Sequence, residues 1–203
     1  RARDARALFG TLPGVLGAVP LSLRFAQEWQ RLTGSPFSLS MREGAYALET
    51  VIPVVGVAGH MRPATTADIP LLARWLQAFD AEALGGRDMA GRDPTRWAEQ
   101  TLAAPERGLS FWEDTCGDVV SLVGHGGPTP HGMRIGPVYT PPEQRGHGYA
   151  SALTAAVTQR LLDGGRRFVF LFTDRANATS NKIYQQIGFR PVCDMEVYLF
   201  EQT

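Results

Sequence analysis

The sequence predicts a mixed α/β protein, and three observations carry that prediction. The uninterrupted apolar run FVFLF at 168–172 is typical of a strand covered on both faces, which is central and parallel to a neighbour. Strand-like and helix-like segments alternate from residue 133 to residue 200. The stretches 109–113 and 119–123 flank a turn that contains Asp and Gly, which predicts an antiparallel hairpin. We therefore expect a mixed sheet with a parallel strand pair near its centre.

The N-terminal segments are predicted to be partly regular. Residues 1–20 are rich in Gly, Pro and Ala and are expected to be irregular. Residues 21–34 place apolar side chains at helical spacing and end on a glycine, so they predict an amphipathic helix with the face Leu21, Phe25, Trp29 and Leu32. Residues 40–51 indicate a strand or a hairpin.

Residues 53–60 resemble a linker, so we place a boundary near residue 58 between an N-terminal extension, 1–58, and a second domain, 59–203. The second domain is expected to begin with a strand at 60–62, followed by a helix, a loop at 85–94 and a second helix at 95–104. Thr66 or Asp68 is expected to cap the first helix, whose apolar face is Ile69, Leu72, Trp75, Leu76 and Phe79. The hairpin, a loop at 124–132 and a strand at 133–140 follow. A helix that ends at 163–165 comes next, then the central strand, a helix at 177–188 and a strand at 193–200. One side of the first of these helices is formed by Tyr149, Leu153, Ala156, Val157, Arg160 and Leu161.

Composition and charge exclude several classes of protein. Lys plus Arg and Asp plus Glu number 20 each, so the formal net charge is zero, which argues against nucleic-acid partners and a polybasic membrane anchor. The two cysteines, Cys116 and Cys193, have no metal-binding or disulfide spacing, so we expect free thiols in a reducing cytoplasm and no bound metal. No apolar run approaches the ~20 residues of a membrane span, and no signal-peptide pattern is present.

The most informative stretch is VYTPPEQRGHGYASALTAAV at 138–157, where a strand leads through two prolines into glycines that open a helix. Gly146 and Gly148 let the backbone curl and let a ligand approach closely. The N–H groups at the start of the helix then point into one concavity at the positive end of the helix dipole, which favours a phosphate or pyrophosphate.

Two other interpretations of this stretch stay open at this point. It could be a tight loop whose helix start is simply packed. It could also belong to a dinucleotide-binding fold, for which Asp174 stands at the end of the next strand. Against that fold, Ser151 occupies the place of the third glycine and six residues separate the strand from Gly146.

Two further features lie on either side of the central strand. Gly136 and Pro137 interrupt a strand, and because proline cannot donate to a ladder, they predict a bulge or a splayed edge. A splay would part this strand from 168–172 and open a slot for an extended, amide-bearing ligand, whereas a merely distorted strand is the other interpretation. In the helix at 177–188, Asn177 could cap the helix or reach a ligand, and Ser180 and Tyr184 follow on the same face. A core contact is the other interpretation of Tyr184.

Together these features resemble the GNAT superfamily of acyl-CoA-dependent N-acyltransferases. The loop pattern of that superfamily, Arg/Gln-X-X-Gly-X-Gly/Ala, is met by Arg145, Gly148 and Ala150. Its later helix often carries Asn, a small residue and Tyr before Gly-Phe, which is met by Asn177, Ser180, Tyr184 and 188–189. The resemblance covers residues 59–203 and implies the GNAT fold with a splayed central parallel pair. Residues 1–58 weakly resemble the often degenerate N-terminal half of some two-part bacterial members.

The resemblance implies acetyl-CoA or another acyl-CoA as co-substrate. The pyrophosphate is then expected on the loop and helix start, formed by Arg145, Gly146, His147, Gly148, Tyr149, Ala150 and Ser151. The pantetheine is expected along Val138, Tyr139 and Thr140 and across to Thr173, with Asn177 and Ser180 beside it and Tyr184 at the sulfur.

The implied reaction is direct attack of an amine on a thioester, with no covalent enzyme intermediate. The strand at 133–140 lacks the Glu that many members use as base, so the candidates are Glu82, Glu113, His125, His131 and Tyr139. Of these we select Glu82 as the base. Asp80 and Glu82 are expected near the acceptor pocket, where they would attract a cationic amine.

The expected acceptor is a small-molecule amine or a peptide N-terminus, without nucleic acid or membrane, and the expected state is a monomer or homodimer. The alternative is a CoA-binding sensor or interaction module without turnover, which the missing strand Glu and the N-terminal extension motivate. A nucleotide-binding enzyme of another class is the remaining possibility.

Overall fold

We describe the protein from a computed structural model, in which residues 2–86 and 92–201 are described. The helices are α1 (Ala2–Phe9), α2 (Leu21–Thr33), α3 (Ile69–Ala83), α4 (Pro94–Ala103), α5 (Tyr149–Asp163) and α6 (Ala178–Ile187), with two short 3-10 turns, η1 (Thr66–Asp68) and η2 (Pro142–Gln144). The strands are β1 (Gly14–Ala18), β2 (Phe37–Leu48), β3 (His60–Pro63), β4 (Gly108–Glu113), β5 (Val119–Gly126), β6 (Gly132–Tyr139), β7 (Phe168–Asp174) and β8 (Arg190–Phe200).

The eight strands form one mixed sheet in the order β1-β8-β2-β7-β6-β5-β4-β3. Strands β6 and β7 pair in parallel, whereas β3, β4, β5 and β6 pair antiparallel in sequence order. The mixed α/β class and the parallel pair predicted from the sequence are therefore confirmed.

The chain divides into two compact units. Unit 1 comprises 1–47, 172–182 and 190–203, and unit 2 comprises 48–171 and 183–189. These limits differ from the division at residue 58 that the sequence suggested, and the assignment of residues 1–58 as a separate extension stays a prediction.

Unit 1 packs its helices α1 and α2 through a small aromatic core. Strand β8 pairs antiparallel with both β1 and β2. Trp29 on α2 is 1% exposed, and its ring lies 5.6 Å from that of Phe200 on β8. The expectation that residues 1–20 are irregular was wrong, because they supply α1 and β1. Helix α2 agrees with the sequence and ends at Gly34 in the left-handed conformation, but Leu21 is exposed rather than part of its buried face.

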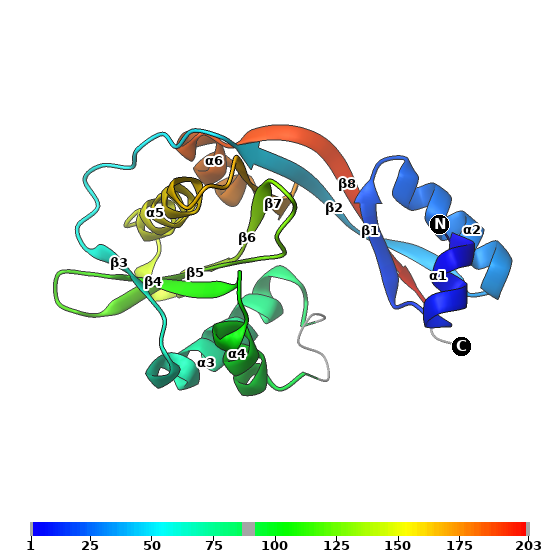
Figure 1. Ribbon diagram of the computed structural model, residues 1–203, viewed down its shortest axis with the longest axis horizontal. Coiled ribbons are helices and arrows are strands. Elements are labelled where there is room, and N and C mark those ends of the chain that lie inside the picture. The colour runs from blue at the N-terminus through cyan, green and yellow to red at the C-terminus, as the bar shows by residue number, and fades with distance from the viewer. Residues whose placement is uncertain (1, 87–91, 202–203) are drawn as a thin grey trace. The chain divides into compact units, whose positions relative to one another are not determined.

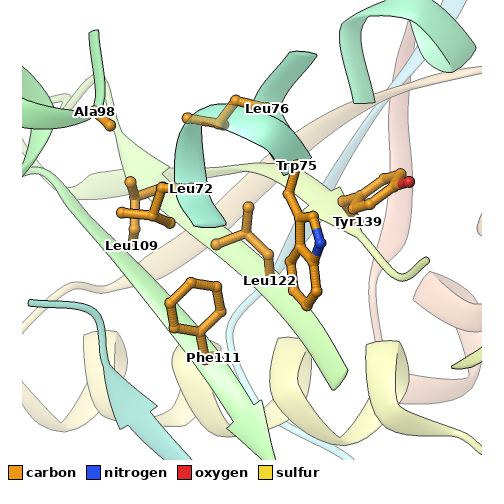
Figure 2. Close-up of a cluster of buried hydrophobic side chains, with 8 residues drawn as sticks. All are labelled: Leu72, Trp75, Leu76, Ala98, Leu109, Phe111, Leu122 and Tyr139. Carbon is orange, nitrogen blue, oxygen red and sulfur yellow. The ribbon is translucent and has the colours of Figure 1, made fainter. Parts of the chain in front are cut away.

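Unit 2 carries helices on both faces of its strands, with α3 and α4 on one face and α5 on the other (Figure 1). The face below α3 and α4 holds a continuous hydrophobic cluster, formed by Leu72, Trp75, Leu76, Ala98, Leu109, Phe111, Leu122 and Tyr139. Figure 2 shows Trp75 between the strand side chains and Tyr139, whose hydroxyl points away from the cluster. The Trp75 ring meets Phe111 and Tyr139 edge-on at 5.7 and 5.9 Å, an arrangement favoured by the ring quadrupoles.

Most elements predicted for unit 2 are present, with three differences. Strand β5 continues to Gly126, into a stretch expected to be loop. The predicted side of α5 included Tyr149 and Arg160, which are not among its buried residues. The residues that are buried are Ala152, Leu153, Thr154, Ala155, Val157 and Thr158. Thr66 does not cap α3. Asp68, the other predicted candidate, holds the N-cap position without a side-chain cap bond and accepts a hydrogen bond from the Thr65 N–H at 2.7 Å. Of the loop predicted at 85–94, residues 87–91 lie outside the described residues.

Among the helices that the structure describes, none is long and apolar enough to cross a membrane.

Candidate functional site

The glycine loop between β6 and α5 has the conformation that its sequence predicts. Gly146 and Gly148 have φ of +84° and +83°, in the left-handed region that favours glycine. A Cβ on Gly148 would lie 2.9 Å from Cγ2 of Val57, so this position also lacks room for a side chain. The loop therefore depends on glycine at Gly148 for two independent reasons.

The N-terminus of α5 presents unpaired backbone donors. Gly148 precedes the helix and provides no side-chain cap. Among the described residues, no acceptor receives a hydrogen bond from the backbone N–H groups of 146–151. The residues from Arg145 to Gly148 are exposed, so these donors can meet a ligand. Because the dipole of a helix places partial positive charge at its N-terminus, the site favours an anion.

Arg145 and Glu82 form a contact that sequence reasoning did not foresee. The Arg145 guanidinium donates to the Glu82 carboxylate at 2.6 Å and, through Nε, to the Thr140 carbonyl at 2.9 Å. The Tyr139 hydroxyl also donates to Glu82, at 3.4 Å, and burial together with the Glu82 charge raises the pKa of Tyr139. Glu82 thus lies against the strand end that leads into the loop, and its role as a base stays a prediction.

Strands β6 and β7 are in register over three residue pairs only. The parallel pairs are Gly132 with Phe168, Met133 with Val169 and Arg134 with Phe170. Strand β6 then continues through Gly136, which has φ of +143°, to Tyr139. The register of β6 against β5 also shifts between Val123 and His125. The irregularity predicted at Gly136-Pro137 is present, and the ladder with β7 ends before it.

Tyr184 lies near the end of α6, within unit 2, and its side chain is 8% exposed. Its ring meets Phe189 edge-on at 6.0 Å. Burial raises the pKa of Tyr184 to about 12, so the hydroxyl stays protonated at neutral pH. None of the described residues makes a hydrogen bond with this hydroxyl. The core contact, one of the two interpretations of Tyr184, is present, and its place at the sulfur stays a prediction.

Thr173, Asn177 and Ser180 belong to unit 1. Thr173 lies on β7 and is 6% exposed. The Asn177 side chain accepts a hydrogen bond from the Ser180 N–H at 3.0 Å, so it caps α6, one of the two roles that the sequence left open. The assignment of these three residues to the ligand stays a prediction.

The other candidate bases have varied surroundings. Glu113 accepts a hydrogen bond from Arg62 at 2.7 Å. His131 is exposed in the turn before β6. His125 on β5 is half-buried, and burial, reinforced by the charge of Arg160, lowers its pKa to about 4. His125 is therefore neutral at pH 7.

A pocket of about 220 Å³ in unit 2 was missed by sequence reasoning. It is lined by Arg92, Trp97, Thr101, Arg107, Gly108, Leu109, Gly124, His125, Gly126, Gly127, Arg134 and Gly136. The sequence signal for this pocket is the glycine-rich stretch at 124–127, which predicts a loop. Because part of this stretch lies on a strand below a helix, its missing side chains leave space between the two elements. The described part of the chain contains no group of three or more metal-ligating side chains.

The fold is that of solved structures named as GNAT-family acetyltransferases, and the fold that the resemblance implied is thereby confirmed. Residues 117–199 match the family model described as FR47-like protein. That segment runs from the β4–β5 turn to β8 and contains the glycine loop.

Solved structures of the same fold include proteins named as acetyltransferases. A GCN5-related N-acetyltransferase from Kribbella flavida is 16% identical with a TM-score of 0.68, over 99% of this chain and 72% of that one. A GNAT-family acetyltransferase from Colwellia psychrerythraea is 15% identical with a TM-score of 0.62, over 100% and 69%. A protein from Clostridium acetobutylicum named as a predicted acetyltransferase and solved with acetyl-CoA is 19% identical with a TM-score of 0.52, over 66% and 90%. No curated protein sequence matches this chain.

Proposed function

We propose that this chain transfers an acetyl or other acyl group from acyl-CoA to a primary amine. The observation that carries the proposal is the row of unpaired N–H groups at 146–151, placed where β6 leads into a helix that begins on glycine. A diphosphate fits this cradle, because it needs several donors, positive potential and no side chain at Gly148.

The strand end supports the rest of the coenzyme site. Residues 138–140 follow the irregular Gly136, beyond the last pair in the β6–β7 register. An extended, amide-bearing pantetheine can bond such a strand as if it were another strand. The Clostridium acetobutylicum protein of this fold was solved with acetyl-CoA, which supports the same choice of ligand here.

In the proposed reaction the chain positions two reactants and handles protons. Holding the amine beside the thioester supplies most of the rate by proximity. The Tyr184 hydroxyl, protonated at neutral pH, hydrogen-bonds the sulfur and gives its proton to the departing thiolate. A neutral amine is required for attack, and Glu82 or a water chain takes the proton that the ammonium form loses.

The direct test is release of thiol from acetyl-CoA by the purified chain in the presence of a broad panel of primary amines, with acetylated product identified by mass. We expect thiol and acetylated amine in equal amounts. Binding of CoA without product from any amine would contradict transfer and favour the CoA-binding module. The pairing of Glu82 with Arg145 at 2.6 Å is the observation that favours this second candidate, because it engages the carboxylate expected to act as base.

A further inference from the structure

The pocket between α4 and strands β4, β5 and β6 is strongly biased in charge. Three arginines line it, Arg92, Arg107 and Arg134, and none of its described lining residues is acidic. His125, which also lines it, is neutral at pH 7 and adds no charge. The whole chain has equal numbers of acidic and basic residues, so this bias is local. Glu106, next in sequence to the lining Arg107, pairs with Arg166 instead.

Two of these arginines are held over glycines and remain available. The Arg107 side chain crosses Gly126, where its Cγ would lie 3.2 Å from an added Cβ, and Nε of Arg134 lies 4.0 Å from the corresponding point at Gly127. Neither Arg107 nor Arg134 has an ion-pair partner among the described residues. Their guanidinium groups can therefore offer paired donors to a planar carboxylate or to a phosphate.

The wall of the pocket carries buried polar atoms that lack partners. Thr101 on α4 is 4% exposed, and its hydroxyl has no hydrogen-bond partner. Nδ1 of His125 is likewise buried and unpaired. Buried polar groups in folded proteins are almost always hydrogen-bonded, so these two unpaired atoms are exceptions that lie in residues of the pocket wall.

The pocket meets β6 at the position where the proposed reaction takes place. Gly136 lines the pocket, and two residues later the same strand reaches Val138, where the pantetheine site begins. Gly124 on β5 leaves no space for a side chain here, since an added Cβ would lie 2.8 Å from the Gly136 carbonyl oxygen. Glycines at both positions thus keep the pocket open up to the irregular part of the strand.

We propose that this pocket binds an anionic group, a carboxylate or a phosphate, on the acceptor amine. The inference rests on the proposed acyl transfer and replaces the cationic acceptor suggested by Asp80 and Glu82. In the step itself the amine nitrogen bonds the acyl carbon and the C–S bond breaks. The ammonium form and the attacking nitrogen lose one proton each, the thiolate takes up one, and one proton is released to solvent.

The test compares paired acceptors, one anionic and one neutral, with rates expressed per concentration of unprotonated amine. The common amino acids are assayed against their carboxamides, and ethanolamine phosphate against ethanolamine, which separates the carboxylate from the phosphate. We expect at least one anionic member to exceed its neutral partner by about tenfold or more in kcat/KM. Arg107→Gln combined with Arg134→Gln should reduce that preference about tenfold and leave the neutral partner unchanged. Equal use of charged and neutral partners, or preference for cationic amines, would overturn the inference while acyl transfer itself stands.

Arg96→Gln is the matched control, because Arg96 is exposed on α4 and does not line the pocket. A loss of preference equal to that of the double variant would contradict a role for the pocket. If no amine is acetylated, the proposed function fails, and the pocket is then judged by calorimetric titration of the CoA-saturated protein with N-acetylglycine and ethanolamine phosphate. Binding that the double variant abolishes supports an anion site, whereas no binding, or equal binding by the double variant, overturns it.

Discussion

Gly148 is the residue at which backbone conformation and the proposed ligand site are most closely connected. Its φ of +83° strains any side chain, and an added Cβ would press on Val57 at 2.9 Å. Gly148→Ala should cost about 1–2 kcal/mol of stability and, by displacing the N–H groups of the loop, lower CoA affinity by roughly tenfold or more. Unfolding in urea and calorimetric titration with CoA measure the two effects.

Gly117→Ala is the matched control for this change. Gly117 has φ of +86° in the β4–β5 turn and nothing within 4 Å of an added Cβ, so it carries the backbone strain without the ligand site. It should lose stability and keep CoA affinity. If both variants bind CoA as the parent does, the loop is not the diphosphate site.

Tyr184 is the residue to which the proposed reaction assigns proton delivery to the thiolate. Because burial raises its pKa to about 12, Tyr184→Phe removes a donor that is protonated throughout the working pH range. We expect kcat to fall by roughly a hundredfold while the KM for acetyl-CoA changes little. Steady-state kinetics on an accepted amine check this split.

Tyr198→Phe serves as comparison, since the Tyr198 hydroxyl donates to Glu196 in unit 1. It should leave kcat unchanged. A proportional rise in KM and fall in kcat for Tyr184→Phe would instead assign Tyr184 to binding, and an unchanged kcat would remove the acid role.

At the scale of elements, the junction of β3 and α3 is set by one carboxylate. Arg62 on β3 donates two hydrogen bonds to Asp68, each 2.9 Å long, and these bonds lower the pKa of Asp68 to about 2. A carboxyl group with a lowered pKa stabilises the fold at any pH above its ordinary pKa near 4. This stabilisation is lost as the pH falls from about 4 towards 2. The parent should therefore lose up to about 2 kcal/mol through this group in that window, and Asp68→Asn should lack that part of the decline.

Urea unfolding between pH 5 and pH 2 measures this difference. Asp118→Asn, at an exposed position in the β4–β5 turn, should keep the acid dependence of the parent. An Asp68→Asn variant whose stability declines with acid as steeply as that of the parent would show that the Arg62–Asp68 contact contributes nothing.

The elements also show what could be predicted from sequence and what could not. Helices α3 and α5 and the β4–β5 hairpin depend on local periodicity and turn residues, which the sequence displays directly. Strand β1 depends on pairing Gly14 with Leu199 and Ala18 with Met195, and such a long-range register has no local signal. The glycine loop followed from Gly146 and Gly148, whereas the Arg145–Glu82 pair and the arginine pocket arise where separate elements meet.

For the whole molecule, a ligand that binds only the folded state must raise stability. At a hundredfold excess over its Kd, CoA should add about 2.7 kcal/mol, which corresponds to a rise in Tm of roughly 5 to 10 °C for a chain of this size. Thermal unfolding with CoA, NAD and ATP in parallel measures this. Stabilisation by NAD and not by CoA would contradict the assignment and favour a dinucleotide enzyme.

The central claim is that the amides of 146–151 bind the diphosphate of CoA, and residue-resolved hydrogen exchange tests it most directly. These amides should exchange fast in the free protein, because they lack acceptors, and at least tenfold more slowly when CoA saturates the chain. Slow exchange at 146–151 in the free protein, or bound CoA that leaves their exchange unchanged, would contradict the account.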